Sequence, residues 1–392
     1  MSDKTKIIFQ QISDLVKSSV RKKKNVYNLH SPFFQKYEKL FLKDCIESTY
    51  VATTGKYINL FENRLKRIIR SNDLVTILNG TIALKVCLKV LGINSGDEVL
   101  VPSLTFVGTV NAIKHAGGTP HFIDTDINNL GVDNNKLVKY LKSISKKNNK
   151  GELINKKTKK KIFGIIPVHV FGNVGEIDKL CKISKKYNLK VIEDAAESLG
   201  SYYKERHVGN FGDLGILSFN ANKVITTGSG GAIICNSKTL GKKIRHLTST
   251  AKIPHSWEFL HDEVGWNYKM NNLSSALGYA QIKNIDKIIK LKKNLSMNYK
   301  KNIKKYKYLK FFNEPINCKS NNWLNVISVK NISLNQRNEI LFLLNKKRIR
   351  CRPVWRLIHK LRMYKNYPRS DLSNAIKLEK TLFCLPSGAE HG

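Results

Sequence analysis

Between about residues 73 and 250, short apolar runs alternate with segments whose apolar positions recur at helical spacing. The runs predict strands and the periodic segments predict helices. Strands and helices that alternate at this spacing favour an α/β fold, with a mostly parallel sheet and helices on both faces. The predicted strands are 74–78, 97–106, 119–126, 162–170, 190–196, 213–220 and 231–237, and one of the predicted helices is 176–187.

After residue 250 the pattern changes to a loop, a long helix and then short strands and helices. We therefore predict a large α/β domain at 31–255 and a smaller C-terminal α+β domain at 256–392. Residues 1–30 form a basic helical extension, in which Ile12 and Leu15 belong to an apolar face. A membrane-surface role for this helix is an alternative because basic residues follow it, but we expect it to pack at the edge of the fold.

The chain carries a formal net charge of +40, which raises the question of a nucleic-acid partner. Its lysines are spread along the chain and are densest at 146–161, where they predict a solvated insertion. Nucleic-acid sites favour arginine and aromatic residues on one face. We therefore do not expect nucleic acid as a partner, whereas a basic cleft for a phosphorylated small molecule fits the composition.

The sequence shows no signal peptide and no apolar run of about 18 residues, so we expect no membrane partner. Its seven cysteines are scattered and form no Cys-x-x-Cys pair. This usage predicts buried thiols in a reduced, cytoplasmic protein without disulfides or a metal site.

Polar and aromatic residues follow several predicted strands at their carboxyl ends, where ligands bind in parallel sheets. Asn79-Gly80-Thr81 opens a helix whose free N–H groups can bind phosphate, although a turn glycine with a threonine cap explains this triplet equally well. Phe106 either stacks on a planar ligand or joins the core. His169 is a ligand, a base or a structural histidine.

Glu193 and Asp194 close a buried apolar strand, where a carboxylate is costly unless it is paired. Asp194 either holds a protonated ring nitrogen or caps the following turn. Ser218 ends the next strand and can bind the same phosphate as Thr81. Lys223 follows it, just before a glycine-rich return into the sheet.

A phosphate cradle, an aromatic residue, a buried aspartate and one lysine thus converge on one edge of the sheet. Pyridoxal 5′-phosphate needs this combination, because an aspartate keeps its ring nitrogen protonated and a lysine forms a Schiff base with its aldehyde. The sequence therefore predicts pyridoxal 5′-phosphate as cofactor, with Lys223 and Asp194 as the catalytic residues.

From about His30 onward the chain resembles the DegT/DnrJ/EryC1/StrS sugar aminotransferases. These are fold type I enzymes like aspartate aminotransferase, so the resemblance implies this fold for the large domain. Glu197 and the segment 30–58 are most similar to the LegC-like branch, which makes UDP-linked 4-amino sugars. The motifs occur in the family's order and include "NGTIAL", "GDEVLVPSLTFVGTVNAI", "PVHVFGN", "VIEDAAESLGS", "FGDLGILSFNANKVITTGSGGAI", "DEVGWNYKMNNLSSALGYAQI" and "RPVWRLIH".

The resemblance implies a role for each matching residue. Lys223 corresponds to the Schiff-base lysine, which also moves the proton, and Asp194 to the partner of the ring nitrogen. Glu197 takes the position beside the cofactor's 3-hydroxyl, where many members have Gln or His. The resemblance also implies that Phe106 stacks on the cofactor ring. It implies that the cofactor phosphate is bound by Gly80, Thr81 and Ser218.

Asn267 resembles an asparagine that reaches the phosphate from the neighbouring subunit, so the resemblance implies a homodimer with shared sites. Trp355 and His359 resemble substrate-side residues, and Arg352 is a candidate for the nucleotide diphosphate. Lys269 stands where the family usually has arginine. We expect this change to alter a contact that the arginine makes with the substrate or within the protein.

The resemblance implies a transaminase that passes an amino group from glutamate to a nucleotide-linked 4-keto-6-deoxy sugar. UDP-4-keto-6-deoxy-GlcNAc is the expected substrate, for nonulosonate or surface polysaccharide synthesis. A GDP-perosamine synthase or another 3- or 4-keto sugar aminotransferase is the enzymatic alternative. A basic nucleic-acid-binding or regulatory protein on the same fold is the non-enzymatic one. The family's dehydratases carry histidine at the lysine position, so Lys223 argues against them.

Overall fold

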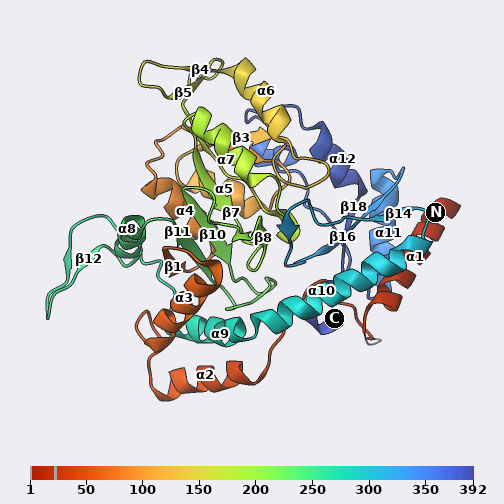
Figure 1. Ribbon diagram of the computed structural model, residues 1–392, viewed down its shortest axis with the longest axis horizontal. Coiled ribbons are helices and arrows are strands. Elements are labelled where there is room, and N and C mark those ends of the chain that lie inside the picture. The colour runs from red at the N-terminus through yellow and green to blue at the C-terminus, as the bar shows by residue number, and fades with distance from the viewer. Residues whose placement is uncertain (1, 22–23) are drawn as a thin grey trace.

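The computed structural model describes residues 2–21 and 24–392. A seven-stranded sheet lies at its centre (Figure 1). The strand order is β1-β11-β10-β7-β6-β2-β3. Neighbours from β10 to β3 run parallel, whereas β11 is antiparallel to both β10 and β1. The strands are β1 (Asp73–Ile77), β2 (Glu98–Pro102), β3 (Thr119–Ile123), β6 (Ile162–Ile165), β7 (Lys190–Asp194), β10 (Leu214–Ser218) and β11 (Gly231–Cys235).

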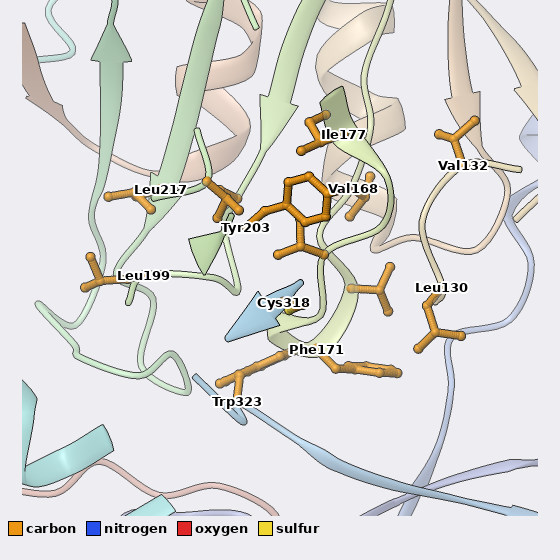
Figure 2. Packing of buried hydrophobic residues seen from close by; sticks show 14 of the residues in the cluster. Leu130, Val132, Val168, Phe171, Ile177, Leu199, Tyr203, Leu217, Cys318 and Trp323 are labelled. Atoms are coloured by element: carbon orange, nitrogen blue, oxygen red, sulfur yellow. The ribbon is translucent and has the colours of Figure 1, made fainter. Parts of the chain in front are cut away.

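Helices cover both faces of this sheet, and each face has its own hydrophobic core. One core joins the sheet to α3 (Lys56–Ile69), α6 (Asn134–Ile144) and α7 (Ile177–Lys186). Figure 2 shows part of it. The other joins the sheet to α4 (Gly80–Val90), α5 (Val107–His115) and α8 (Lys238–Thr248). The strands are apolar on both sides because both of their faces are buried. The predicted mostly parallel α/β fold is confirmed.

The run predicted as one strand over 162–170 is shorter in the structure. Strand β6 ends at Ile165, and the chain then passes through a short 3₁₀ helix at Val170–Gly172. Phe171 has a φ of 60° there, in the left-handed region that a non-glycine residue rarely adopts. An apolar run does not reveal this change of direction, because the residues before and after it are both buried.

The Lys-rich segment 146–161 forms a hairpin at the edge of the molecule (Figure 1). Its strands are β4 (Ser145–Lys147) and β5 (Leu153–Asn155). The side chain of Asn155 is buried and donates to a carboxylate oxygen of Glu98 over 2.9 Å. The Asn155 amide and the Thr158 hydroxyl therefore both bind Glu98 and fix a hairpin most of whose lysines are exposed.

A second unit is built on an antiparallel sheet of order β14-β16-β18-β17. The helices α1 (Asp3–Ser19), α10 (Ile285–Asn302) and α11 (Leu334–Lys346) pack around it, and α1 lies beside α10 and α11 (Figure 1). Ile12 and Leu15 of α1 are fully buried in this core. Met1, Lys22 and Lys23 of the predicted extension lie outside the described residues. The strands are β14 (Leu309–Phe311), β16 (Asn325–Val329), β17 (Arg352–Pro353) and β18 (Leu382–Leu385).

Helix α9 (Asn272–Lys283) packs on α2 (Lys36–Glu47) and α3, although its sequence lies beyond residue 256. The side-chain oxygen of Asn272 accepts the backbone N–H of Tyr57 over 3.0 Å, which locks α9 to the start of α3. The predicted domain ranges stay predictions. Helix α9 lies in the range predicted for the small domain, but it packs on helices from the range predicted for the large domain.

Smaller elements complete the fold. A three-stranded sheet brings together distant parts of the chain, and a hairpin projects from the body near α8 (Figure 1). None of the helices in the described part of the chain is long and apolar enough to cross a membrane. These elements are β8 (Tyr202–Tyr203), β9 (Arg206–His207), β15 (Cys318–Lys319), β12 (Lys252–Ile253), β13 (Leu260–His261), α12 (Ser373–Thr381) and the 3₁₀ helices Ile303–Lys305, Ile358–Lys360, Arg362–Tyr364 and Ala389–His391.

We predict that Leu15→Ala lowers the free energy of unfolding by about 2–5 kcal/mol, because it leaves a cavity in the core shared by α1, α10 and α11. Ile7→Ala on the same helix is the control, since Ile7 is 46% exposed and its loss costs about 0.5 kcal/mol or less. Urea unfolding followed by circular dichroism measures both. Equal, small effects would show that α1 does not pack this way in solution.

Candidate active site

The carboxyl ends of β1, β7 and β10 border a cavity of about 570 Å³. Its walls contain both proposed catalytic residues, the start of helix α4 and several aromatic rings. Parallel strands direct their carboxyl ends to one edge of a sheet, which is why residues distant in sequence meet here. Eight predicted residues line the cavity: Gly80, Thr81, Phe106, Asp194, Glu197, Ser218, Lys223 and Trp355.

The start of helix α4 forms one end of the cavity. Asn79 caps the helix, and its side-chain oxygen accepts the N–H of Ile82 over 2.9 Å. The N–H groups of the first helical turn lack partners within the helix, so those of Gly80 and Thr81 are available to an anion. A Cβ on Gly80 would lie 3.2 Å from the Cβ of Ser218. The glycine therefore lets Ser218 approach the helix, as a compact phosphate site requires.

Asp194 ends β7 and is 5% exposed. One carboxylate oxygen accepts the Thr109 hydroxyl over 2.7 Å, and the other accepts the backbone N–H of Ala196 over 3.1 Å. The second contact caps the following turn, and the first fixes the carboxylate at the cavity wall. Both roles considered for Asp194 are therefore compatible.

The neighbouring Glu193 has a structural role together with His169. Its carboxylate pairs with Nε2 of His169 at 2.9 Å and also accepts backbone N–H groups, including that of Gly209 over 2.9 Å. Both side chains are buried, and neither lines the cavity of Lys223. Of the alternatives for His169, the structure favours the structural histidine.

Lys223 lies in the turn after β10, and its Nζ is 3.1 Å from a carboxylate oxygen of Glu197. The other oxygen of Glu197 accepts the backbone N–H of Phe171 over 2.9 Å. Burial raises the pKa of Glu197 above its usual value, and the Lys223 charge and the Phe171 N–H oppose this rise. The pair therefore places a lysine amine and a buried carboxylate in contact at the cavity wall.

Aromatic rings supply the apolar surfaces of the cavity. Phe106 is 53% exposed at the start of α5, so one of its faces is free for a planar ligand. Trp355 stacks on Phe171, with ring centres 4.9 Å apart and an angle of 26°. Trp323 also lines the cavity and lies over Lys223.

Four predicted residues do not line this cavity. His359 is buried, and its Nδ1 forms a hydrogen bond of 2.7 Å with the Ser103 hydroxyl in the core. Arg352 lies exposed on β17, and Asn267 lies exposed beside Ser249. Lys269 forms a backbone bridge with Ile77. The substrate and partner roles of these residues stay predictions.

Thr109 and Trp323 were missed by the sequence reasoning. Thr109 follows Phe106 by one helical turn, so a search for polar residues on that face of the helix could have found it. Trp323 is 100 residues from Lys223 and has no local signal. Among the described residues, no cluster of three or more His, Cys, Asp or Glu side chains is placed to hold a metal ion.

A family profile for these aminotransferases matches residues 34–391. The chain belongs to the DegT/DnrJ/EryC1/StrS aminotransferase family. It is 35% identical over 336 residues to the GDP-perosamine synthase of Escherichia coli O157:H7, covering 86% of each chain. It is 34% identical to the UDP-4-amino-4,6-dideoxy-N-acetyl-beta-L-altrosamine transaminase of a Campylobacter jejuni strain, covering 66% of this chain and 65% of the relative.

Solved structures of such aminotransferases share this fold. Helicobacter pylori PseC, an aminotransferase involved in the biosynthesis of pseudoaminic acid, superposes with a TM-score of 0.84 at 25% identity. The match covers 93% of this chain and 94% of that one. This agreement confirms the fold type I architecture predicted for the large domain.

Pyridoxal phosphate is the cofactor of this aminotransferase family, and the name of the Bacillus subtilis relative EpsN, 30% identical over 370 residues, describes a pyridoxal phosphate-dependent aminotransferase. The cavity fits it: the start of α4 suits the phosphate, the exposed face of Phe106 suits the ring, and the fixed carboxylate of Asp194 suits the ring nitrogen. Lys223 provides the amine on the same cavity wall as Glu197. The predicted cofactor is confirmed, and the role of each residue toward it stays a prediction.

We predict that Thr109→Val weakens pyridoxal phosphate binding about 10- to 100-fold, because the valine cannot donate to the buried Asp194 carboxylate. Thr109→Ser keeps the hydroxyl and should bind nearly as tightly as the wild type. Equilibrium titration of each full-length protein with the cofactor, followed by absorbance, measures the difference. Equal affinities of the valine variant and the wild type would show that the hydrogen bond from Thr109 to Asp194 does not contribute to cofactor binding.

Proposed function

We propose that this aminotransferase uses glutamate to aminate the keto carbon of a nucleotide-linked 4-keto-6-deoxy sugar. The observation that carries the proposal is the cavity itself, where Lys223, Glu197 and Asp194 meet an anion-binding helix start. Its aromatic walls also suit a ligand with apolar sugar faces and a nucleobase.

Each residue has a distinct task in this proposal. Bound pyridoxal phosphate supplies an electron sink for the electrons left when a C–H proton is removed. Lys223 Nζ takes up this proton and then donates it to a second carbon atom, so that it acts first as a base and then as an acid. Glu197 accepts a hydrogen bond from the same nitrogen and so holds the amine at the cavity wall. Asp194 keeps the ring nitrogen of the cofactor protonated.

Two nucleotide sugars are candidates. UDP-4-keto-6-deoxy-GlcNAc is the substrate expected from Glu197 and segment 30–58, and the similarity to the UDP-amino-sugar transaminase supports it. The GDP-linked sugar of perosamine synthesis is the second candidate, and the 35% identity over 86% of the chain to a GDP-perosamine synthase favours it. Either product would serve nonulosonate or surface polysaccharide synthesis.

The cell compartment and the assembly belong to the same proposal. All seven cysteines are free thiols, which suits the reducing cytoplasm. Asn267 is exposed and outside the cavity of its own chain, as expected if it serves the site of a second subunit. We therefore propose a cytoplasmic homodimer with shared sites.

We predict that the wild type develops a visible absorption band with pyridoxal phosphate and that borohydride attaches the cofactor covalently to Lys223. Lys223→Ala should show neither effect, because Lys223 alone supplies a side-chain amine among the described residues that line this cavity. Absorbance spectra and peptide mass spectrometry measure both. Covalent attachment at another lysine would contradict the assignment.

In the substrate test, the cofactor-loaded wild type receives glutamate together with one of two sugars. One is UDP-4-keto-6-deoxy-GlcNAc, and the other is the GDP-linked 4-keto-6-deoxy sugar of perosamine synthesis. A preference for one nucleotide of about 100-fold in kcat/KM identifies it, since a specific base contact contributes about 3 kcal/mol. Release of 2-oxoglutarate and mass spectrometry of the sugar product measure the reaction. Reaction with neither sugar would overturn the proposed function while leaving the cofactor site intact.

We predict that an equal mixture of Lys223→Ala and Asn267→Ala chains, dissociated and reassembled, recovers about a quarter of the wild-type activity. Half of the reassembled dimers are mixed, and each of these holds one site with both residues. The transaminase assay measures the recovery, and each variant reassembled alone is the control. No recovery would show that Asn267 serves the site of its own chain or none.

A further inference from the structure

Trp323 contacts the turn of Lys223 in two ways. The face of its indole ring lies over the lysine amine, with Nζ 4.2 Å from the ring centre. Its ring nitrogen donates to the backbone carbonyl of Asn222, the residue before Lys223, over 2.7 Å. One side chain therefore contacts both the charge of Lys223 and the backbone that carries it.

The backbone of Trp323 is itself held on both sides. Its N–H donates to the side-chain oxygen of Asn321 over 2.9 Å, and its carbonyl accepts Nζ of Lys292 over 3.1 Å. The amide nitrogen of Asn321 donates to the backbone carbonyl of Glu197 over 2.8 Å. Trp323 is thus tied to the turn that carries Glu197, the other partner of Lys223.

Phe171 contacts both Trp323 and Glu197. Its ring centre lies 6.2 Å from that of Trp323, and Figure 2 shows the two side chains next to each other. Its backbone N–H donates to Glu197, and its left-handed conformation is stabilised by these surroundings. Trp323 therefore stands in a rigid setting rather than at a mobile surface.

Several charged or titratable groups surround the lysine amine. Glu197 is its ion-pair partner, and Asp194 and His115 line the same cavity. Beyond Trp323 lie His30, whose ring centre is 6.4 Å from the indole, and Lys292. Burial holds the pKa of His30 well below its usual value, so this ring is neutral near pH 7. The groups in direct contact with the ammonium form are the Glu197 carboxylate and the indole face.

We propose that Trp323 is a positioning residue that aims the amine of Lys223 into the cavity and stabilises its protonated form. The ring face attracts a cation through its quadrupole, most strongly where little water competes. The bond to Asn222 fixes the turn, so the amine keeps one direction in both charge states. The inference rests on the proposed role of Lys223 in cofactor binding and proton transfer.

The test measures the rate at which the full-length chain, freed of cofactor, captures pyridoxal phosphate between about pH 6 and pH 11. The midpoint of the pH profile reports how strongly the site stabilises the lysine ammonium. The plateau at high pH reports how well the neutral amine is aimed. The variants are Trp323→Leu, which removes the ring, and Trp323→Phe, which keeps a ring face but loses the N–H donor.

We predict that Trp323→Leu lowers the midpoint by about 1 pH unit, because loss of the ring face disfavours the protonated amine. Its plateau should also fall, about tenfold, through loss of the hydrogen bond to Asn222. Trp323→Phe should lower the plateau to a similar extent and keep the midpoint within about 0.3 units. Phe383→Leu is the control, because Phe383 is a buried aromatic residue of β18 in a different core, and it should change neither quantity.

An unchanged midpoint in a folded Trp323→Leu protein would overturn the inference, as would an equal shift in Phe383→Leu. Circular dichroism checks the fold, and Trp323→Met replaces the leucine variant if that does not fold. A shifted midpoint in Trp323→Phe would also contradict the role of the ring face. If the wild type itself captures no cofactor at Lys223, the proposed role of that lysine fails first, so the two failures are distinguishable.

Discussion

The site depends on one constraint, that a buried carboxylate needs hydrogen bonds or an opposite charge in place of water. Strand β7 and its following turn carry three such groups, Glu193, Asp194 and Glu197. Their partners come from the segment after β6, from α5 and from the turn after β10. Satisfying these carboxylates therefore aligns the elements that form the cavity, and the geometry around Lys223 follows from it.

Much of this arrangement follows from local pattern. Apolar runs mark the strands of the parallel sheet, and the residues just after them meet because parallel strands end at a common edge. This reasoning predicts that Gly80, Asp194 and Lys223 are neighbours, and they do line one cavity. The family motifs then supported the cofactor and the reaction class.

Other features depend on contacts between distant segments, which a local pattern does not contain. Trp323 reaches the lysine turn from the segment just before β16. The N-terminal residues from Ile8 to Tyr27 complete a core whose other members follow residue 285. His359 sits in a motif that suggests a substrate contact, yet Ser103 binds its ring within the core. Motif position indicates the neighbourhood of such a residue, whereas packing decides which way its side chain points.

The antiparallel strand β11 has a consequence for how the protein is made. It lies between β1 and β10, and it pairs with β1 from about 160 residues further along the chain. A ribosome adds about 5–20 residues per second, so β1 waits roughly 10–30 s for this partner. During that time the edge of β1 is open to other chains. We therefore expect the nascent chain to depend on chaperones more than its final compact sheet suggests.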